Sequence, residues 1–327
     1  MRATMSLIRR EFAAYFTGPI GYVALFAFLV LNGLLFWLVV GLLTEKGPRG
    51  VEYPMQVMLG GAENPPAALV AGVLFWGLFP AVTGIVTSRL IAEERGSGTL
   101  ESLLTAPIRD WQVVLAKFVA CFGFYLLLWA TTLVYVPVLA DLRAEWQGNF
   151  TFYAAVLLAG LLFVLFAKLG FFFEWNGWFV LALGVLGPAL AVAGGYLHAT
   201  QDERYLVHVA AGIDPRPIVT SYLGVVLAGA MFLALGLLVS SWVKSQLVAW
   251  MLSLLLGLGF VLPAMLRWQF DPGSSVYPVV YYLSVPEHFR HDFTRGRIDT
   301  RPIVLYVTVT LCCLFLTVRS LEARRLR

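Results

Sequence analysis

The sequence predicts an all-α protein that crosses a membrane several times. Of its 327 residues, 60% are apolar and only 13% are charged, and the mean hydropathy is +0.81. A soluble domain carries roughly 25% charged residues, so this chain is too apolar to be a soluble globule. Its long apolar runs lack the strict alternation of a membrane β-barrel, which leaves helices of about 20 residues as the spanning elements.

Eight apolar runs within a single transmembrane domain, residues 1–327, are long enough to cross a bilayer. Two of them are separated by only three residues, 174–176, and form either a tight helical hairpin or a re-entrant pair. A long polar loop, residues 267–301, precedes the last run and is expected on the outer side. The expected spans are residues 20–43, 68–88, 113–139, 152–173, 177–197, 217–240, 247–266 and 302–318.

Residues 6–16 predict a short amphipathic helix that lies in the membrane interface before the first span. Apolar side chains recur at spacings of three and four, and basic side chains suited to lipid headgroups lie elsewhere on the helical wheel. Gly18-Pro19 then breaks the helix, although the segment could instead extend the first span. The residues of this interfacial elbow are Ile8, Phe12 and Phe16 on the apolar face and Arg9 and Arg10 on the basic side.

The distribution of charge predicts that both chain termini are cytoplasmic. An even number of spans places the termini on one side. With the termini inside, the inner segments hold thirteen basic and seven acidic residues, a net charge of +6, and the outer segments hold ten basic and twelve acidic residues. Basic residues favour the cytoplasmic ends of spans, so this orientation is the expected one, and the chain is a multi-pass protein of the inner or plasma membrane.

The polar passage at residues 89–111 is therefore expected in the cytoplasm. Gly96-Ser97-Gly98 permits a sharp change of direction, after which Thr99 can cap a short helix that ends at Pro107. Three leucines at helical spacing give this helix one apolar face, suited to a groove on a soluble partner; the alternative is that they fold back onto the membrane. These leucines are Leu100, Leu103 and Leu104.

Several stretches resemble the permease subunits of type-2 ATP-binding-cassette exporters, in particular the gliding-motility and copper-enzyme-maturation branch. They are RREFAAYFTGPIGYV near the start, EERGSGTLESLLTAPIRDWQVVLAKF after the second span, TSYLGVVLAGAMFLALGLLVSSWVKSQLVA at residues 220–249 and LSVPEHFRHDFTRGRIDTRP at residues 283–302. They follow the family's order over most of the chain. The family has a six-span core, so residues 142–214, which contribute two of the expected spans, stand as an inserted hairpin.

The resemblance implies a coupling helix at residues 99–104 that contacts a separate ATPase subunit, and an elbow at residues 6–16. It also implies a second permease subunit, identical or diverged. The chain has no G-x-x-x-x-G-K-[ST] phosphate-binding loop, so it is expected not to be an enzyme, and ATP and Mg²⁺ are expected in the ATPase. The motif positions that carry over are Glu93, Glu94, Arg95, Gly98, Thr99, Glu101 and Pro107.

Other features of the sequence suggest weaker sites. If helical, His288 and His291 could hold a metal ion, but they equally suit an aromatic and charged helix at the outer interface. Lys168 and Glu174 are ionisable groups near the inner end of the hairpin. The basic residues are dispersed along the chain, which argues against nucleic acid as a partner.

Two alternatives to an exporter permease remain open at this stage. One is a membrane scaffold or anchor of a surface or motility complex, across which no solute moves. The other is an ion-coupled transporter, which would need paired broken spans and ionisable residues at mid-membrane depth.

Overall fold

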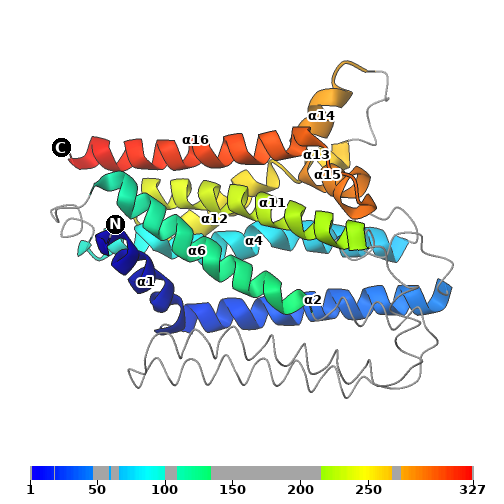
Figure 1. Cartoon of the computed structure of the whole chain (residues 1–327), viewed down its shortest axis with the longest axis horizontal. Helices are drawn as coiled ribbons and strands as arrows, with labels where there is room; N and C mark the ends of the chain where they lie inside the picture. Colours follow the sequence, from blue (N-terminus) through cyan, green and yellow to red (C-terminus); the bar gives the residue numbers. More distant parts are fainter. Residues whose placement is uncertain are drawn as a thin grey trace. The chain divides into compact units, whose positions relative to one another are not determined.

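The computed structural model describes residues 2–17, 19–46, 59, 66–99, 109–133, 215–266 and 274–325. Every regular element among them is a helix, as the sequence predicts (Figure 1). Contacts divide the chain into two compact units, and the helices below belong to the first unit except for the last two residues of α6. The expected spans at residues 152–173 and 177–197, and the inserted region 142–214 around them, lie outside the described residues.

The chain begins with two consecutive helices, α1 (Arg2–Thr17) and α2 (Pro19–Lys46). The expected break between the amphipathic segment and the first span is confirmed. The turn is tight, because a Cβ atom on Gly21 would clash with the carbonyl oxygen of Tyr15, and the Tyr22 hydroxyl donates to the carbonyl of Phe16 at 2.9 Å. That α1 lies in the membrane interface remains a prediction.

Five helices among the described residues are long and apolar enough to cross a membrane, and each overlaps an expected span. The helix α2 covers the first expected span, and its described apolar part is Ala24–Phe36. The five candidates fall in α4 (Pro66–Gly96), α6 (Asp110–Thr132), α11 (Pro215–Trp242), α12 (Gln246–Leu258) with its extension into α13 (Pro263–Leu266), and α16 (Thr300–Arg325).

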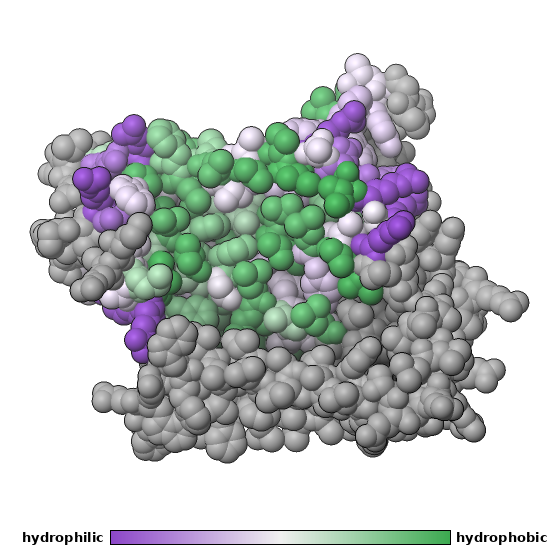
Figure 2. Space-filling model, in the orientation of Figure 1, coloured by the Kyte–Doolittle hydropathy of each residue, from purple (hydrophilic) through white to green (hydrophobic). Residues whose placement is uncertain are grey.

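The helix α11 lies at the centre of this unit and packs against α4, α12 and α16. Its apolar window is 78% buried, whereas those of α12 and α16 are each 22% buried. The surface of these outer helices is apolar between two hydrophilic ends (Figure 2). Exposed apolar side chains such as Leu255 on α12 and Leu311 on α16 contribute to it. Exposure of such a surface to water is unfavourable in free energy, whereas contact with lipid or another apolar partner is not.

Side-chain contacts fix the directions of the helices. Lys117 near the start of α6 contacts Glu94 near the end of α4, and Tyr125 further along α6 donates to the carbonyl of Val225 in α11 at 2.9 Å. The termini of the chain, the end of α4 and the start of α6 consequently lie at one end of the bundle, called here the α1 end (Figure 1). Helix α6 runs antiparallel to α11, and α11 begins at the opposite end, called here the α15 end.

Part of the segment expected to be a long outer loop, residues 267–301, is helical, and its second half is largely buried whereas α14 is not. It contains α14 (Tyr277–Leu283), α15 (Val285–His291) and the 3₁₀ helix η2 (Phe293–Arg295). Phe289 and Phe293 are fully buried, and their rings lie against Gly224 of α11, where a Cβ atom would meet them at 2.8 to 3.0 Å. Small residues permit this kind of close packing between elements in membrane proteins.

Candidate functional site

The helix α1 is anchored to the α1 ends of α4 and α6 by Tyr15. The Tyr15 ring stacks on Phe124 at 4.6 Å between centroids, and its hydroxyl donates to the carbonyl of Val86 at 3.0 Å. The guanidinium of Arg89 lies 4.7 Å from the centre of the same ring, a cation–π contact. One fully buried side chain of α1 therefore contacts both long helices that flank the polar passage.

The residues of the expected elbow differ in their contacts and exposure. Ile8 packs against a buried cluster that includes Val113 of α6. The Phe12 and Phe16 rings lie 5.4 Å apart, and Phe16 contacts Phe124 at 5.8 Å. The basic residues on the other side, Arg9 and Arg10, are exposed.

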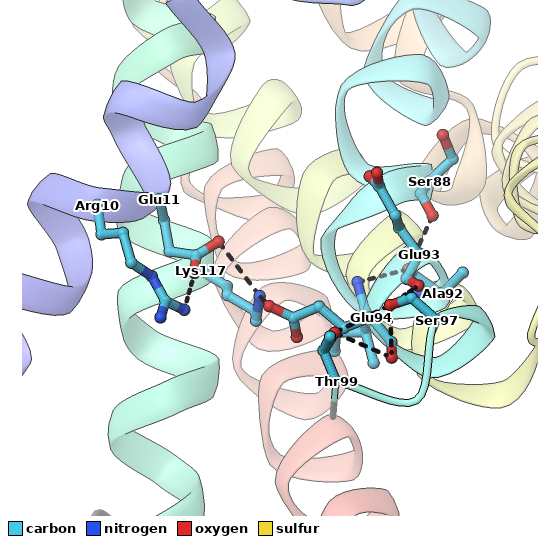
Figure 3. Close-up of polar contacts among 11 residues, drawn as sticks. Arg10, Glu11, Ser88, Ala92, Glu93, Glu94, Ser97, Thr99 and Lys117 are labelled. Carbon is cyan, nitrogen blue, oxygen red and sulfur yellow. Dashed lines mark hydrogen bonds and ion pairs between the residues drawn. The ribbon is translucent and has the colours of Figure 1, made fainter. Parts of the chain in front are cut away.

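A buried ion-pair network joins α1, α4 and α6 at this end of the bundle (Figure 3). The Lys117 side chain is 1% exposed, and its Nζ lies 2.7 Å from Oε1 of Glu94 and 3.2 Å from Oε2 of Glu11. The other Glu11 oxygen accepts from Arg10 at 2.8 Å. Because an ionised group is costly to bury alone, the single cation holds the two carboxylates, and with them the two helices that carry them, beside α6.

Glu11 is held in its charged form by this arrangement. Burial acts to raise its pKa, but the charge of Lys117 and the hydrogen bonds from Arg10 and Lys117 outweigh burial, so the pKa lies below its ordinary value. The ionised carboxylate is therefore the stable state of Glu11 at neutral pH.

The polar passage leaves α4 through a turn closed by side-chain hydrogen bonds. Gly98 has a φ of 75°, in the left-handed region that favours glycine, which confirms the change of direction expected there. The Ser97 hydroxyl donates to the carbonyl of Glu93 at 2.9 Å, and the Thr99 hydroxyl donates to that of Glu94 at 3.3 Å. Thr99 thus bonds backward onto α4. Glu93 itself is exposed.

Arg95 attaches the end of α4 to the end of α11. Its Nη1 donates to the carbonyl oxygens of Trp242 at 2.5 Å and Ser241 at 3.4 Å. The last carbonyls of a helix have no partner within the helix and carry the negative end of its dipole, so a guanidinium is well suited to bind them. Arg95 therefore caps α11 from a different helix.

The expected coupling residues are only partly within the described chain. Glu94, Arg95, Gly98 and Thr99 lie together at the α1 end, with Glu93 exposed beside them. The other expected positions, Leu100, Glu101, Leu103, Leu104 and Pro107, lie outside the described residues, so the coupling helix itself remains a prediction.

Sequence reasoning missed Glu11 and Lys117 as members of this site. Both entered the prediction only as charges in the count that set the orientation. The signal that could have found Lys117 is its position after the first turn of an apolar span, because an ionisable group inside such a span usually has a partner. Nothing in the sequence could identify Glu11 as that partner, since the two residues are 106 positions apart.

The two histidines at the α15 end have different polar partners. His288 is buried and its Nδ1 lies 2.9 Å from the Tyr306 hydroxyl, whereas Nε2 of His291 lies 3.2 Å from Oε2 of Glu287. Within the described ranges, no group of three side chains is placed to hold a metal ion. Burial lowers the pKa of His288 to about 4, so its imidazole is neutral.

Comparison with known proteins agrees with this architecture. A search of curated proteins finds no match. A family model described as ABC-2 family transporter protein matches residues 18–185, more than half of the chain, and the match includes α2, α4, the polar passage and α6. It also extends into residues 142–185, part of the region interpreted above as an insertion. The chain therefore belongs to the ABC-2 transporter family and is a multi-pass membrane permease of an ABC transporter.

Proposed function

We propose that this chain is the permease subunit of an ABC exporter, driven by a separate ATPase that docks on the coupling helix at residues 99–104. The observation that carries the proposal is the Lys117 network. It fixes α4, which precedes the polar passage, to α6, which follows it, and it fixes both helices to α1. A segment anchored at both ends in this way transmits a displacement to the spans instead of moving independently of them.

The proposed cycle has two states. Two permease subunits pair, identical or diverged, and two ATPase subunits close when they bind ATP and Mg²⁺. Closure displaces the coupling helices, and the spans follow as packed bodies because a close-packed interior shifts between discrete arrangements. The permease changes state because ATP binds the closed ATPase pair more tightly, and it needs no chemistry of its own.

Three further parts of the proposal rest on the resemblance to type-2 exporters and on the charge pattern. Outward transport and the gliding-motility and copper-enzyme-maturation branch come from the quoted stretches of sequence. The cytoplasmic location of the α1 end comes from the charge count. The Arg95 cap adds support for a role of the α1 end in transmission, because it extends the anchored region from α4 to α11.

The docking role can be tested by placing a charge in the expected apolar face. Leu103→Asp is expected to leave membrane insertion intact but to abolish co-purification with the ABC ATPase partner, which is to be sought first among the products of the neighbouring genes, because a buried unpaired carboxylate opposes docking. Ile298→Asp is the matched control: Ile298 is 60% exposed and lies near the α15 end, so this variant should retain the ATPase.

The result also separates the exporter from a membrane scaffold. If Leu103→Asp retains the ATPase as well as the control does, the docking role of residues 99–104 is wrong. If the wild-type chain binds no ATPase, whether co-expressed with the neighbouring gene product or isolated from its own membrane, the scaffold explanation replaces the exporter.

A further inference from the structure

A buried serine of α11 lies within hydrogen-bonding distance of the backbone of α4. The Oγ of Ser240 accepts from the backbone N–H groups of Ile91 at 3.1 Å and Ala92 at 3.0 Å, and its hydroxyl donates to the carbonyl of Ser88 at 3.1 Å. Figure 3 shows Ser88 and Ala92, the two α4 residues at either end of this group of contacts. Ser240 is fully buried, so water does not compete for these groups.

These contacts alter the hydrogen-bond ladder of α4. In a regular α-helix the N–H of Ala92 bonds to the carbonyl of Ser88, four residues earlier. Here both groups also bond to one hydroxyl from another helix, although α4 runs as a continuous helix from Pro66 to Gly96. Insertions of this kind are a recognised cause of helix bending. Residues 88–92 are therefore a place where α4 can bend.

The part of α4 beyond this joint is attached to α11 and to the turn that follows it. Arg95 caps α11, as described above. The backbones also approach closely, because a Cβ atom on Gly96 would lie 2.9 Å from the carbonyl oxygen of Lys244. Next to Ser240, the Ser241 hydroxyl lies 3.2 Å from that of Ser320 in α16. The last residues of α4 thus contact the end of α11 and the α11–α12 turn, and the end of α11 contacts α16.

We propose that Ser240 is a positioning residue that clips residues 91–96 of α4 to the end of α11, so that the two move together when the coupling region is displaced. The rest of α4 then moves relative to this body by bending at residues 88–92. This inference deepens the proposed function and rests on it for the source of the displacement. Motion that enters at the polar passage reaches α11, α12 and α16 through Ser240 and Arg95.

The first test uses the permease alone in nanodiscs, with spin labels on the exposed residues Ser97 and Lys244 and the native cysteines replaced. Ser240→Ala is expected to increase the population outside the main distance peak about 5-fold, the ratio for one lost hydrogen bond of about 1 kcal/mol. Ser253→Ala is the matched control, because the buried Ser253 hydroxyl donates within α12, to the carbonyl of Ala249. Equal distance distributions in the two variants would contradict the proposed role of Ser240.

The second test uses the wild-type sequence at position 240, so it decides the proposal even if Ser240→Ala does not fold. In the complex with the ATPase held in its ATP-bound state, the Ser97–Lys244 distance should stay constant. The distance from Ser97 to Val73, an exposed residue earlier in α4, should change. A change in the Ser97–Lys244 distance as large as that in the other pair would refute the inference. Failure of the ATPase to bind would instead count against the proposed function. The first test would still decide whether Ser240 holds α4 to α11.

Discussion

Lys117 is the residue on which the geometry of the α1 end depends most. It is the only cation in contact with Glu94 among the ion pairs of the described residues, and Glu11 has Arg10 as a second partner. Removing Lys117 leaves the Glu94 carboxylate without its ion-pair partner and Glu11 with Arg10 alone. Loss of one member of a buried ion pair costs more free energy than the intact pair contributes relative to apolar residues. The stability of this end should therefore respond more to Lys117 than to any surface charge.

Lys117→Met is expected to destabilise the protein by about 3–5 kcal/mol, measured as a fall in thermal stability of the purified permease in detergent. The triple variant Glu11→Gln, Lys117→Met, Glu94→Gln removes all three charges and should recover most of this loss. If the single variant is as stable as the wild type, the network has no structural role. If the triple variant is no better than the single one, packing of the Lys117 chain matters more than its charge.

His288, at the α15 end of the bundle, makes the stability of the folded protein depend on pH. Its pKa in the folded protein is about 4, below the ordinary value of 6.5, so the unfolded chain binds a proton more readily. The resulting stability is fully present above pH 6.5 and is lost as the pH falls from 6.5 to 4, by up to about 3 kcal/mol.

Thermal unfolding of the wild type and His288→Gln between pH 7.5 and pH 4.5 measures this effect. The glutamine can still bond to the Tyr306 hydroxyl but does not titrate, so its curve should vary less with pH. A constant difference between the two proteins across the range would exclude His288 as the titrating group.

At the scale of elements, the packing of α11 against its neighbours depends on glycines placed where the helices approach. A Cβ atom on Gly236 would clash with the Thr87 hydroxyl of α4, and one on Gly229 would clash with the Tyr125 ring of α6. Helix propensity alone would favour alanine at both positions by up to about 1 kcal/mol. Close contact between helices therefore overrides local propensity along α11.

Gly236→Ala and Gly77→Ala separate these two effects. Gly77 lies in α4, and a Cβ atom added there would have no neighbouring atom within 4 Å, so alanine should be neutral or stabilising. Gly236→Ala should destabilise by about 1–3 kcal/mol, because α4 and α11 must separate or repack. Thermal stability of the two purified variants measures the difference. Equal effects would mean that the contact between α4 and α11 tolerates the extra atom.

At the scale of the whole molecule, the helix directions predict which residues share a side of the membrane. The polar turn at Ser97 and the chain termini lie at the α1 end, and Ile298 lies near the α15 end. With the charge bias of the sequence, the α1 end is expected in the cytoplasm.

Labelling with a membrane-impermeant maleimide tests this orientation. Cysteine at position 97 should react in inside-out vesicles and cysteine at position 298 in intact spheroplasts, in a background that lacks Cys121, Cys312 and Cys313. The reverse pattern would invert the orientation and remove the cytoplasmic setting of the coupling region. Reaction of both cysteines from one side would contradict the helix directions.

The sequence by itself determined the class of protein, the approximate position of each described span, the break after α1 and the turn at Gly98. These depend on local properties: the length of an apolar run, helical spacing, and the backbone freedom of glycine. Only the tertiary structure decided that Lys117 joins Glu11 to Glu94, that Arg95 caps α11, that Ser240 enters the backbone ladder of α4 and that α15 is buried. Each of these depends on residues far apart in the chain, and a lysine, an arginine or a serine is compatible with many partners until packing brings one within hydrogen-bond distance.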